Sequence, residues 1–170
     1  EAKQLCATAV LWAWAWKIVP EEREWLCDNM GLVALATVAD CVPLGPLNRA
    51  LVRDGLGKIR EGAEPGLSVL SAKLGLDLET IDSETLAMKV VPCLNAPGRL
   101  ELADLSVKVL SFEPASGSAV DDLVALNRKR QGLTAKIMEE AIPFMEGKAC
   151  CVAGKEDWPV GVLSGVASRI

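Results

Sequence analysis

The feature of this sequence that most constrains its fold is a long stretch of helical spacing over residues 119–146. Apolar side chains at Leu123, Leu126 and Leu133 recur at intervals of three and seven residues, which places them along one face of an α-helix. The proline-containing segment 114–118 interrupts the pattern on one side, and a glycine ends it on the other. The sequence therefore predicts one long, unbroken helix that any fold must accommodate.

Shorter helices are predicted through most of the remaining chain, because proline and glycine residues mark helix starts and ends there. Residues 32–39 are apolar on every side, so they form either a buried helix or a buried strand, and periodicity does not decide between the two. After the long helix the pattern changes, and residues 149–153 predict one short buried strand. The shorter predicted helices span residues 3–17, 20–31, 48–61, 65–75, 82–92 and 103–111.

The absence of histidine limits the chemistry that this chain can perform. It excludes Ser-His-Asp and Cys-His nucleophilic catalysis, so carboxylates, arginines or metals must carry any catalysis that occurs here. The six cysteines include no C-x-x-C pair, and without histidine they do not form a zinc site. We interpret them as buried thiols in a reducing cytoplasm.

The sequence predicts a cytoplasmic protein. The apolar stretch 11–16 ends at Lys17, far short of the length that spans a bilayer, and we find no charged leader followed by a small-residue cleavage site. The net charge of −5 is unfavourable for binding DNA. A local basic patch can still bind it, because phosphate attraction depends on the nearby surface rather than on the total charge.

Asp40 is a candidate metal ligand. It follows the apolar run 32–39 and precedes a valine and a proline. A carboxylate in such a position is costly unless it caps a helix, pairs with a cation or binds a metal. From residue types alone, both a structural cap and a metal ligand fit this position.

Segment 92–99, with the sequence PCLNAPGR, combines Asn95 and Arg99 with two prolines and a glycine. A helix must stop or kink at the first proline, so the segment is predicted to be a rigid loop. Pro97 fixes one backbone angle and Gly98 allows a sharp turn after it, which would aim Arg99 at an anion. The alternative is an ordinary turn between helices with one exposed arginine.

Two further segments could contact phosphate. The long helix reads NRKRQ over residues 127–131, so Arg128 and Arg130 make its middle strongly basic. That surface either lines the path of a nucleic acid or is simply a solvated helix face. Near the end of the chain, Ser168 and Arg169 follow a glycine-containing stretch, which could cradle a phosphate at a helix start.

Taken together and in this order, these segments resemble RecJ-like exonucleases of the DHH phosphoesterase superfamily. Residues 35–44 (LATVADCVPL) resemble the fourth DHH motif, and residues 48–56 resemble the helix that follows it in that family. Residues 92–100 (PCLNAPGRL) resemble a family segment that usually reads PRLNAxGR. Residues 126–130 (LNRKR) are similar to the family's long connecting helix, and residues 157–169 resemble the start of its DHHA1 domain.

The resemblance implies a mainly α-helical fragment of an α/β protein. The intact parent would be a metal-dependent 5′–3′ exonuclease that hydrolyses phosphodiester bonds in single-stranded DNA during DNA repair and recombination, with single-strand-binding or replication proteins as partners. The implied divisions are residues 1–46 as the end of the DHH domain, 47–117 as a helical region carrying the Asn95–Arg99 segment, 118–147 as the long connecting helix and 148–170 as the start of the DHHA1 domain with its first strand.

The resemblance also implies a cofactor and its ligand. Two divalent metals, Mn²⁺ or Mg²⁺, would activate water and stabilise the charge on the scissile phosphodiester, and Asp40 would be the metal ligand present here. The family's first three motifs would lie upstream of Glu1, and the glycine-rich end of DHHA1 would lie beyond Ile170. Because one carboxylate cannot hold two hard cations in water, we expect this chain alone to be inactive.

The remaining site residues are implied to contact the substrate. Asn95 and Arg99 would face the substrate phosphate. Ser168 and Arg169 would hold the terminal 5′-phosphate. Arg128 and Arg130 would line the path of the single strand together with Lys129.

The sequence departs from the family pattern at several positions. Cys93 stands where the family's arginine is expected, Pro97 replaces the usual alanine, and Pro159 replaces a histidine. Residues 164–165 read Ser-Gly in place of the usual glycine-isoleucine. Two other interpretations therefore stay open: a DHH phosphodiesterase acting on small nucleotides, and a catalytically dead relative that serves as a scaffold in a replication complex.

Overall fold

The computed structural model describes residues 4–100, 103–111, 117–146 and 150–170, and every regular element within them is helical. In chain order these are α1 (Ala7–Ile18), η2 (Pro20–Glu22), α2 (Arg23–Asp28), α3 (Met30–Ala39), α4 (Pro46–Arg60), α5 (Pro65–Lys73), η3 (Leu78–Thr80), α6 (Ser83–Thr85), η4 (Leu86–Val90), α7 (Val91–Leu100), α8 (Asp104–Leu110), α9 (Gly117–Met145) and α10 (Val160–Ala167). Among these elements, none is long and apolar enough to cross a membrane.

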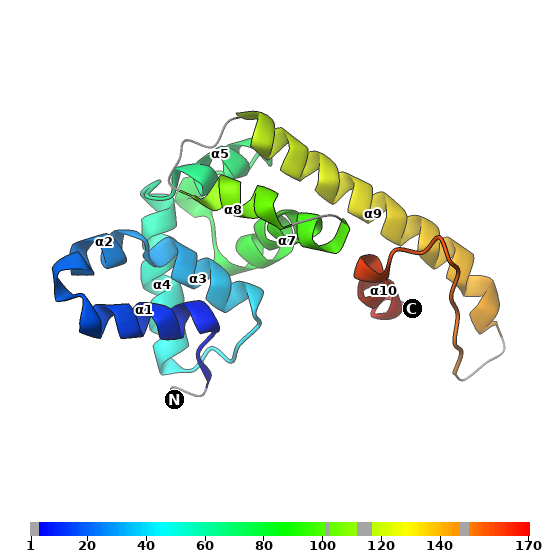
Figure 1. Cartoon of the computed structure of the whole chain (residues 1–170), viewed down its shortest axis with the longest axis horizontal. Coiled ribbons are helices and arrows are strands. Elements are labelled where there is room, and N and C mark those ends of the chain that lie inside the picture. Colours follow the sequence, from blue (N-terminus) through cyan, green and yellow to red (C-terminus); the bar gives the residue numbers. More distant parts are fainter. Residues whose placement is uncertain (1–3, 101–102, 112–116, 147–149) are drawn as a thin grey trace.

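The helices from α1 to α8 form one body, and α9 extends from it to α10 (Figure 1). The main core of this body is built from fully buried side chains that include Ile59 on α4, Leu70 on α5, Val90 on η4 and Leu123 on α9. A second, smaller core joins the far half of α9 to α10 through Ile137, Trp158 and Val162. The long helix therefore takes part in both cores and fixes their separation.

The predicted long helix is confirmed. α9 continues without a break from Gly117 to Met145, and Pro143 lies inside its last turn. Residues 112–116, which include most of the predicted break before this helix, lie outside the described part of the chain. Gly62 and Gly75 adopt positive φ angles of 75° and 69°. Each lies one residue beyond the C-terminal cap of its helix, α4 or α5, as expected for glycines that end helices.

Residues 32–39, for which the sequence left both helix and strand open, belong to helix α3, which packs against α1 and α4. The prediction that Gly31 ends the preceding helix is wrong, because Gly31 is a buried residue in the first turn of α3. The α3–α4 contact is close, since a side chain at Gly55 on α4 would collide with the backbone of Met30. Close backbone packing of this kind selects glycine for its small size rather than for its ability to end a helix.

The prediction of a loop over residues 92–99 is also wrong, because these residues belong to helix α7. The five residues before α7 form the π-helical turn η4, in which hydrogen bonds span five residues instead of four. This wider turn makes room for the ring of Pro92, whose missing N–H then falls at the start of an α-helix where it costs least. The second proline, Pro97, is buried inside the helix.

Two smaller expectations are corrected. Residues 150–153 form no strand, and Ala149 lies outside the described residues. The cysteines are free thiols, but only Cys6 and Cys93 are buried, whereas Cys41 and Cys150 are exposed. The interpretation of all the cysteines as buried thiols therefore holds for only part of the set.

Candidate functional site

Asn95 and Arg99 lie on one exposed face of α7, one helical turn apart. Residues at this spacing point in the same direction from a helix, so a helix rather than a rigid loop positions this pair. The proposed action of Pro97 and Gly98 as a turn that aims Arg99 does not apply. What holds these side chains in place is the buried opposite face of α7, which includes Cys93 and Ala96.

Arg99 joins α7 to α10. Its Nη1 donates to the backbone oxygen of Gly161 at 3.1 Å and to the hydroxyl of Ser164 at 3.3 Å. The close approach depends on Gly161, because a Cβ atom there would collide with the backbone oxygen of Arg99. Arg99 therefore has a structural tie, and its remaining N–H groups have no acceptor among the residues that the structure describes.

Arg130 approaches the same place from α9. Its Nε and Nη2 both donate to Asn127 Oδ1, at 3.1 and 2.9 Å, and its side chain is half-buried. Burial lowers the pKa of Arg130, and the positive charges of Arg99 and Arg169 lower the pKa further. The charges of Arg99 and Arg169 thus both act on the Arg130 guanidinium, and we call Arg99, Arg130 and Arg169 the arginine cluster.

No carboxylate among the described residues forms an ion pair with a member of the arginine cluster. Like charges held together in this way repel one another. An anion between them would relieve that repulsion and could accept hydrogen bonds from planar guanidinium groups. The arrangement is therefore suited to binding a phosphate or another oxyanion.

Ser168 and Arg169 come directly after α10 ends at Ala167. The expectation that they lie at a helix start is wrong, because Ser168 is the C-terminal cap and its hydroxyl donates to the Gly165 backbone oxygen at 3.3 Å. A helix C-terminus presents carbonyl oxygens and repels anions. Any anion bound here would be attracted by the arginine side chains and not by the helix dipole.

Arg128 does not join the cluster. It is exposed and lies two residues before Arg130 on α9, which turns it about 200° away around the helix axis. The structure thus separates two residues that the sequence grouped into one basic face. Lys129, between them, has an interaction of its own.

Asn127 is a site residue that the sequence analysis did not select. It is only 8% exposed, and its Nδ2 donates to the Cys93 thiol on α7 at 3.1 Å. Burial raises the pKa of Cys93, against the opposing effects of the Asn127 hydrogen bond and the Arg130 charge. The only sequence signal that could have indicated this residue is its place at the start of the basic run 127–131.

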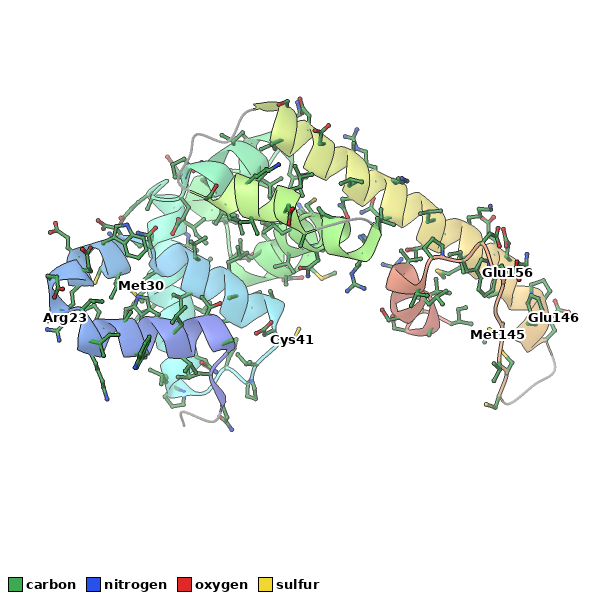
Figure 2. The ribbon with its side chains drawn as sticks, viewed as in Figure 1. Arg23, Met30, Cys41, Met145, Glu146 and Glu156 are labelled. Atoms are coloured by element: carbon green, nitrogen blue, oxygen red, sulfur yellow. The ribbon has the colours of Figure 1, made fainter. Side chains whose placement is uncertain are left out.

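Asp40 is exposed at the C-terminal end of α3. The negative end of the helix dipole disfavours a carboxylate there, and aspartate caps helices at their other end. The next residue, Cys41, has a positive φ of 51°, and Figure 2 shows it at the tip of α3 where the chain leaves the helix. Asp40 thus occupies the C-terminal cap position of α3, where its backbone N–H donates to the oxygens of Ala36 and Val38, but its carboxylate gains no stabilisation from the helix dipole.

The described residues contain no group of three or more His, Cys, Asp or Glu side chains that could hold a metal ion. Asp40 is accordingly a single oxygen donor and does not constitute a metal site by itself. A mostly apolar groove of about 390 Å³ lies between α3, α7 and α8, and it is lined by both Ala39 and Asn95. The groove thus connects the end of α3 that carries Asp40 with the exposed face of α7.

Comparison with curated proteins identifies the relatives of this chain. It is 34% identical to the single-stranded-DNA-specific exonuclease RecJ of Bacillus subtilis, over 99% of this chain and 22% of the relative. It is also 34% identical to RecJ of Thermus thermophilus, over 82% of this chain and 21% of the relative. The chain spans about a fifth of the length of these two relatives. No protein-family profile matches it.

Solved structures give the same result for the fold. The chain superposes on T. thermophilus RecJ in complex with Mn²⁺ with a TM-score of 0.76 and 30% identity, over 84% of this chain and 22% of that one. A structure of exonuclease RecJ bound to manganese gives a TM-score of 0.75 and 29% identity, over 84% of this chain and 37% of that one. T. thermophilus RecJ has also been solved with Mg²⁺.

Proposed function

Because the chain is homologous to the RecJ single-stranded-DNA-specific exonucleases over most of its length, we propose that it is the helical part of such an enzyme. The intact protein would hydrolyse phosphodiester bonds in single-stranded DNA in the 5′–3′ direction and depend on Mn²⁺ or Mg²⁺. It would act in DNA repair and recombination in the cytoplasm, alongside single-strand-binding or replication proteins. This chain, in which Asp40 is the one candidate metal ligand among the described residues, would be inactive on its own.

In this proposal Asp40 contributes one oxygen ligand to the metal site. The remaining ligands would come from outside the described residues, since these contain no ligand cluster. A bound divalent metal would supply a nucleophilic water and neutralise charge on the phosphate. The exposure of Asp40 at the unfavourable end of α3 supports this role, because such a carboxylate gains little from its own chain.

The arginine cluster is the proposed phosphate-binding site. Arg99 would face the substrate phosphate together with Asn95, and Arg169 and Ser168 would hold the terminal 5′-phosphate. The half-buried Arg130 on α9 would strengthen both contacts, because charge-assisted hydrogen bonds are stronger where water is partly excluded. Arg128 would lie outside this site and contribute only a sequence-independent attraction for the passing strand.

The four proposed divisions of the chain keep the boundaries implied by the resemblance. Residues 1–46 would complete the DHH domain, and residues 47–117 would carry the face with Asn95 and Arg99. Residues 118–147 would form the long connecting helix, and residues 148–170 would begin the DHHA1 domain. The arginine cluster draws on α7, α9 and the segment that follows α10. Under this assignment it would therefore lie where the last three divisions meet.

The observation that carries the proposal is geometric: hydrogen bonds hold Arg99 against α10 and hold Arg130 to Asn127, which itself contacts α7. No carboxylate among the described residues forms an ion pair with either arginine. Its test is Arg99→Lys in the intact protein, assayed for hydrolysis of single-stranded DNA. Lysine keeps the charge but lacks the planar fork, so we expect the rate to fall by about tenfold or more. The melting temperature should fall only slightly, because the two exposed hydrogen bonds from Arg99 to α10 are weakened. An unchanged rate would exclude Arg99 from the site.

A matched control separates phosphate binding from the structural tie between α7 and α10. Ser164→Ala removes one hydrogen bond to Arg99 without changing any charge, so the rate should change little. If Ser164→Ala lowers the rate as much as Arg99→Lys does, Arg99 acts through α10 and not on the substrate. If the intact protein is a scaffold without catalytic activity, it would give no hydrolysis even without a substitution.

A further inference from the structure

We propose that Asn127 is a positioning residue that fixes the Arg130 guanidinium in the arginine cluster, and that the Cys93 thiol in turn fixes the orientation of Asn127. The inference rests on the proposed function and deepens it, since it assigns the support of the phosphate site. It connects α7 to α9 through two side chains 34 residues apart in sequence.

The chemistry of the partners determines how the Asn127 amide must be oriented. Arginine carries only hydrogen-bond donors, so the amide oxygen has to face Arg130, as its contacts of 2.9 and 3.1 Å require. The amide nitrogen then faces away from Arg130 and needs an acceptor. Cys93 Sγ provides that acceptor at 3.1 Å.

The hydrogen bonds that link Cys93, Asn127 and Arg130 lie where water has little access. Cys93 is 0% exposed and Asn127 is 8% exposed, so water does not readily replace either partner. An amide group left without a partner in such surroundings destabilises the arrangement. The buried network therefore holds Arg130 in one orientation, whereas an arginine on an open surface would sample many.

The remaining donors of Arg130 point to the reason for this arrangement. Arginine has five N–H donors, and the two contacts with Asn127 use one at Nε and one at Nη2. Within the described part of the chain, the other donors of the guanidinium have no hydrogen-bond partner, so they can serve an anion. Because Arg99 and Arg169 repel Arg130, an unsupported Arg130 would turn away from the cluster, and Asn127 prevents this.

A double-mutant cycle in the intact protein tests the inference, with binding of a 5′-phosphorylated single-stranded oligonucleotide as the measurement. Arg130→Leu should weaken binding by about tenfold, the effect of losing one charge-assisted contact. Asn127→Ala should weaken it by about fivefold or more in the unsubstituted protein. In the Arg130→Leu background, Asn127→Ala should have no further effect, because its target is already absent.

Cys93→Ala supplies a second route to the same result and is the variant to use if Asn127→Ala does not fold. It removes the acceptor of Asn127 Nδ2 and should weaken binding severalfold, again only when Arg130 is present. Arg53→Leu is the control for loss of a positive charge, because Arg53 is an exposed residue on α4 that pairs with Asp54. Binding by the control should be unchanged.

The possible outcomes distinguish this inference from the proposed function. If Arg130→Leu binds the oligonucleotide as well as the unsubstituted protein does, the phosphate site itself is wrong. If Arg130→Leu weakens binding but Asn127→Ala and Cys93→Ala do not, the site stands and the positioning role is wrong. Equal losses from Asn127→Ala with and without Arg130 would show a general structural effect and also overturn the positioning role.

Discussion

At the scale of single residues, Asp40 and Glu64 are carboxylates in unfavourable positions for opposite reasons. Asp40 is exposed but lies at the negative end of a helix dipole. Glu64 is only 5% exposed, and its carboxylate lies against Gly31 of α3 with no well-aligned hydrogen bond to the described residues. Each of these two positions leads to a different prediction about the stability of the protein.

Asp40→Ala should leave folding intact and abolish nuclease activity in the intact protein. Removing a carboxylate from a helix C-terminus relieves a repulsion of about 0.3–1 kcal/mol, so the melting temperature should stay the same or rise slightly. Thermal unfolding and single-stranded DNA hydrolysis measure the two effects. Asp54→Ala is the control, because Asp54 is an exposed carboxylate on α4 that pairs with its neighbour Arg53. A large loss of stability with retained activity would make Asp40 structural.

Glu64 should make stability depend on pH. Burial raises the pKa of Glu64 to about 7, although the Gly31 backbone and the Lys58 charge act to lower it and Glu61 adds a smaller rise. A carboxyl group with a raised pKa binds its proton more tightly in the folded state. Its stabilising contribution is therefore complete below the unfolded pKa of about 4.5 and is lost as pH rises through about 7.

Glu64→Gln removes this titration. In urea unfolding at pH 5.5 and 7.5, the unsubstituted protein should lose roughly 1–3 kcal/mol more stability over this interval than the variant does. The interval is favourable because this sequence contains no histidine, the side chain that ordinarily titrates there. Identical pH dependence in the two proteins would show that the Glu64 carboxyl reaches solvent.

Residue-scale features were predictable from sequence only where local chemistry sufficed. Asp40 was selected because it follows an apolar run, and Arg99 because of its neighbours in the chain. The role of Asn127 could not be derived, since its partner Cys93 is 34 residues away. A hydrogen bond between distant segments depends on how α7 and α9 pack, and no local pattern reports that packing.

At the scale of helices, the fold could be predicted where spacing and glycine stops agree. α9 followed from the apolar spacing over residues 119–146, and Gly62 and Gly75 marked the ends of α4 and α5. The helix over residues 92–99 was missed because prolines normally stop helices, and a π-helical turn that accommodates one gives no local signal. The strand over residues 150–153 failed because a strand needs a paired neighbour, and the described residues offer none.

The contact between α7 and α10 carries a prediction at this scale. Gly161→Ala would push a methyl group into the Arg99 backbone oxygen, so α10 has to move away from α7. We expect a lower melting temperature and weaker oligonucleotide binding, by a few-fold or more, because the Arg99 and Arg169 ends of the cluster separate.

Gly165→Ala is the control on the same helix, because a Cβ atom there meets nothing within 4 Å. Alanine favours helix more than glycine does, by about 1 kcal/mol, so this variant should be neutral or slightly more stable and should bind normally. Thermal unfolding and binding of the same oligonucleotide measure both variants. Equal behaviour of the two would show that α7 and α10 do not depend on close contact at Gly161.

At the scale of the whole molecule, the two candidate groups lie on different parts of the structure. Asp40 belongs to α3 in the body of α1 to α8, whereas the arginine cluster gathers where α9 and α10 meet α7. The apolar groove runs from Ala39, next to Asp40, to Asn95, which lies one helical turn before Arg99 on α7. Because the chain as a whole carries a net charge of −5, the attraction for a phosphate has to come from this local group of positive charges.

This division predicts that the 170-residue chain, expressed alone, separates DNA binding from catalysis. With Asp40 as the one candidate ligand and no ligand cluster among the described residues, titration with Mn²⁺ should show no binding tighter than about millimolar. Hydrolysis of single-stranded DNA should be absent, although circular dichroism should report a helical chain. The arginine cluster should still give weak oligonucleotide binding that decreases as salt concentration rises.

The intact protein is the positive control, and Arg130→Leu in the isolated chain is the matched negative one. Each phosphate contact to a single strand contributes about 0.7 to the slope of the logarithm of affinity against the logarithm of salt concentration. Arg130→Leu should therefore reduce that slope by about this amount, provided that circular dichroism shows the same helical content in both chains. Metal-dependent hydrolysis by the isolated chain would contradict the assignment of Asp40 as a single ligand, because the chain would then have to hold its metal with residues that the proposed site does not include.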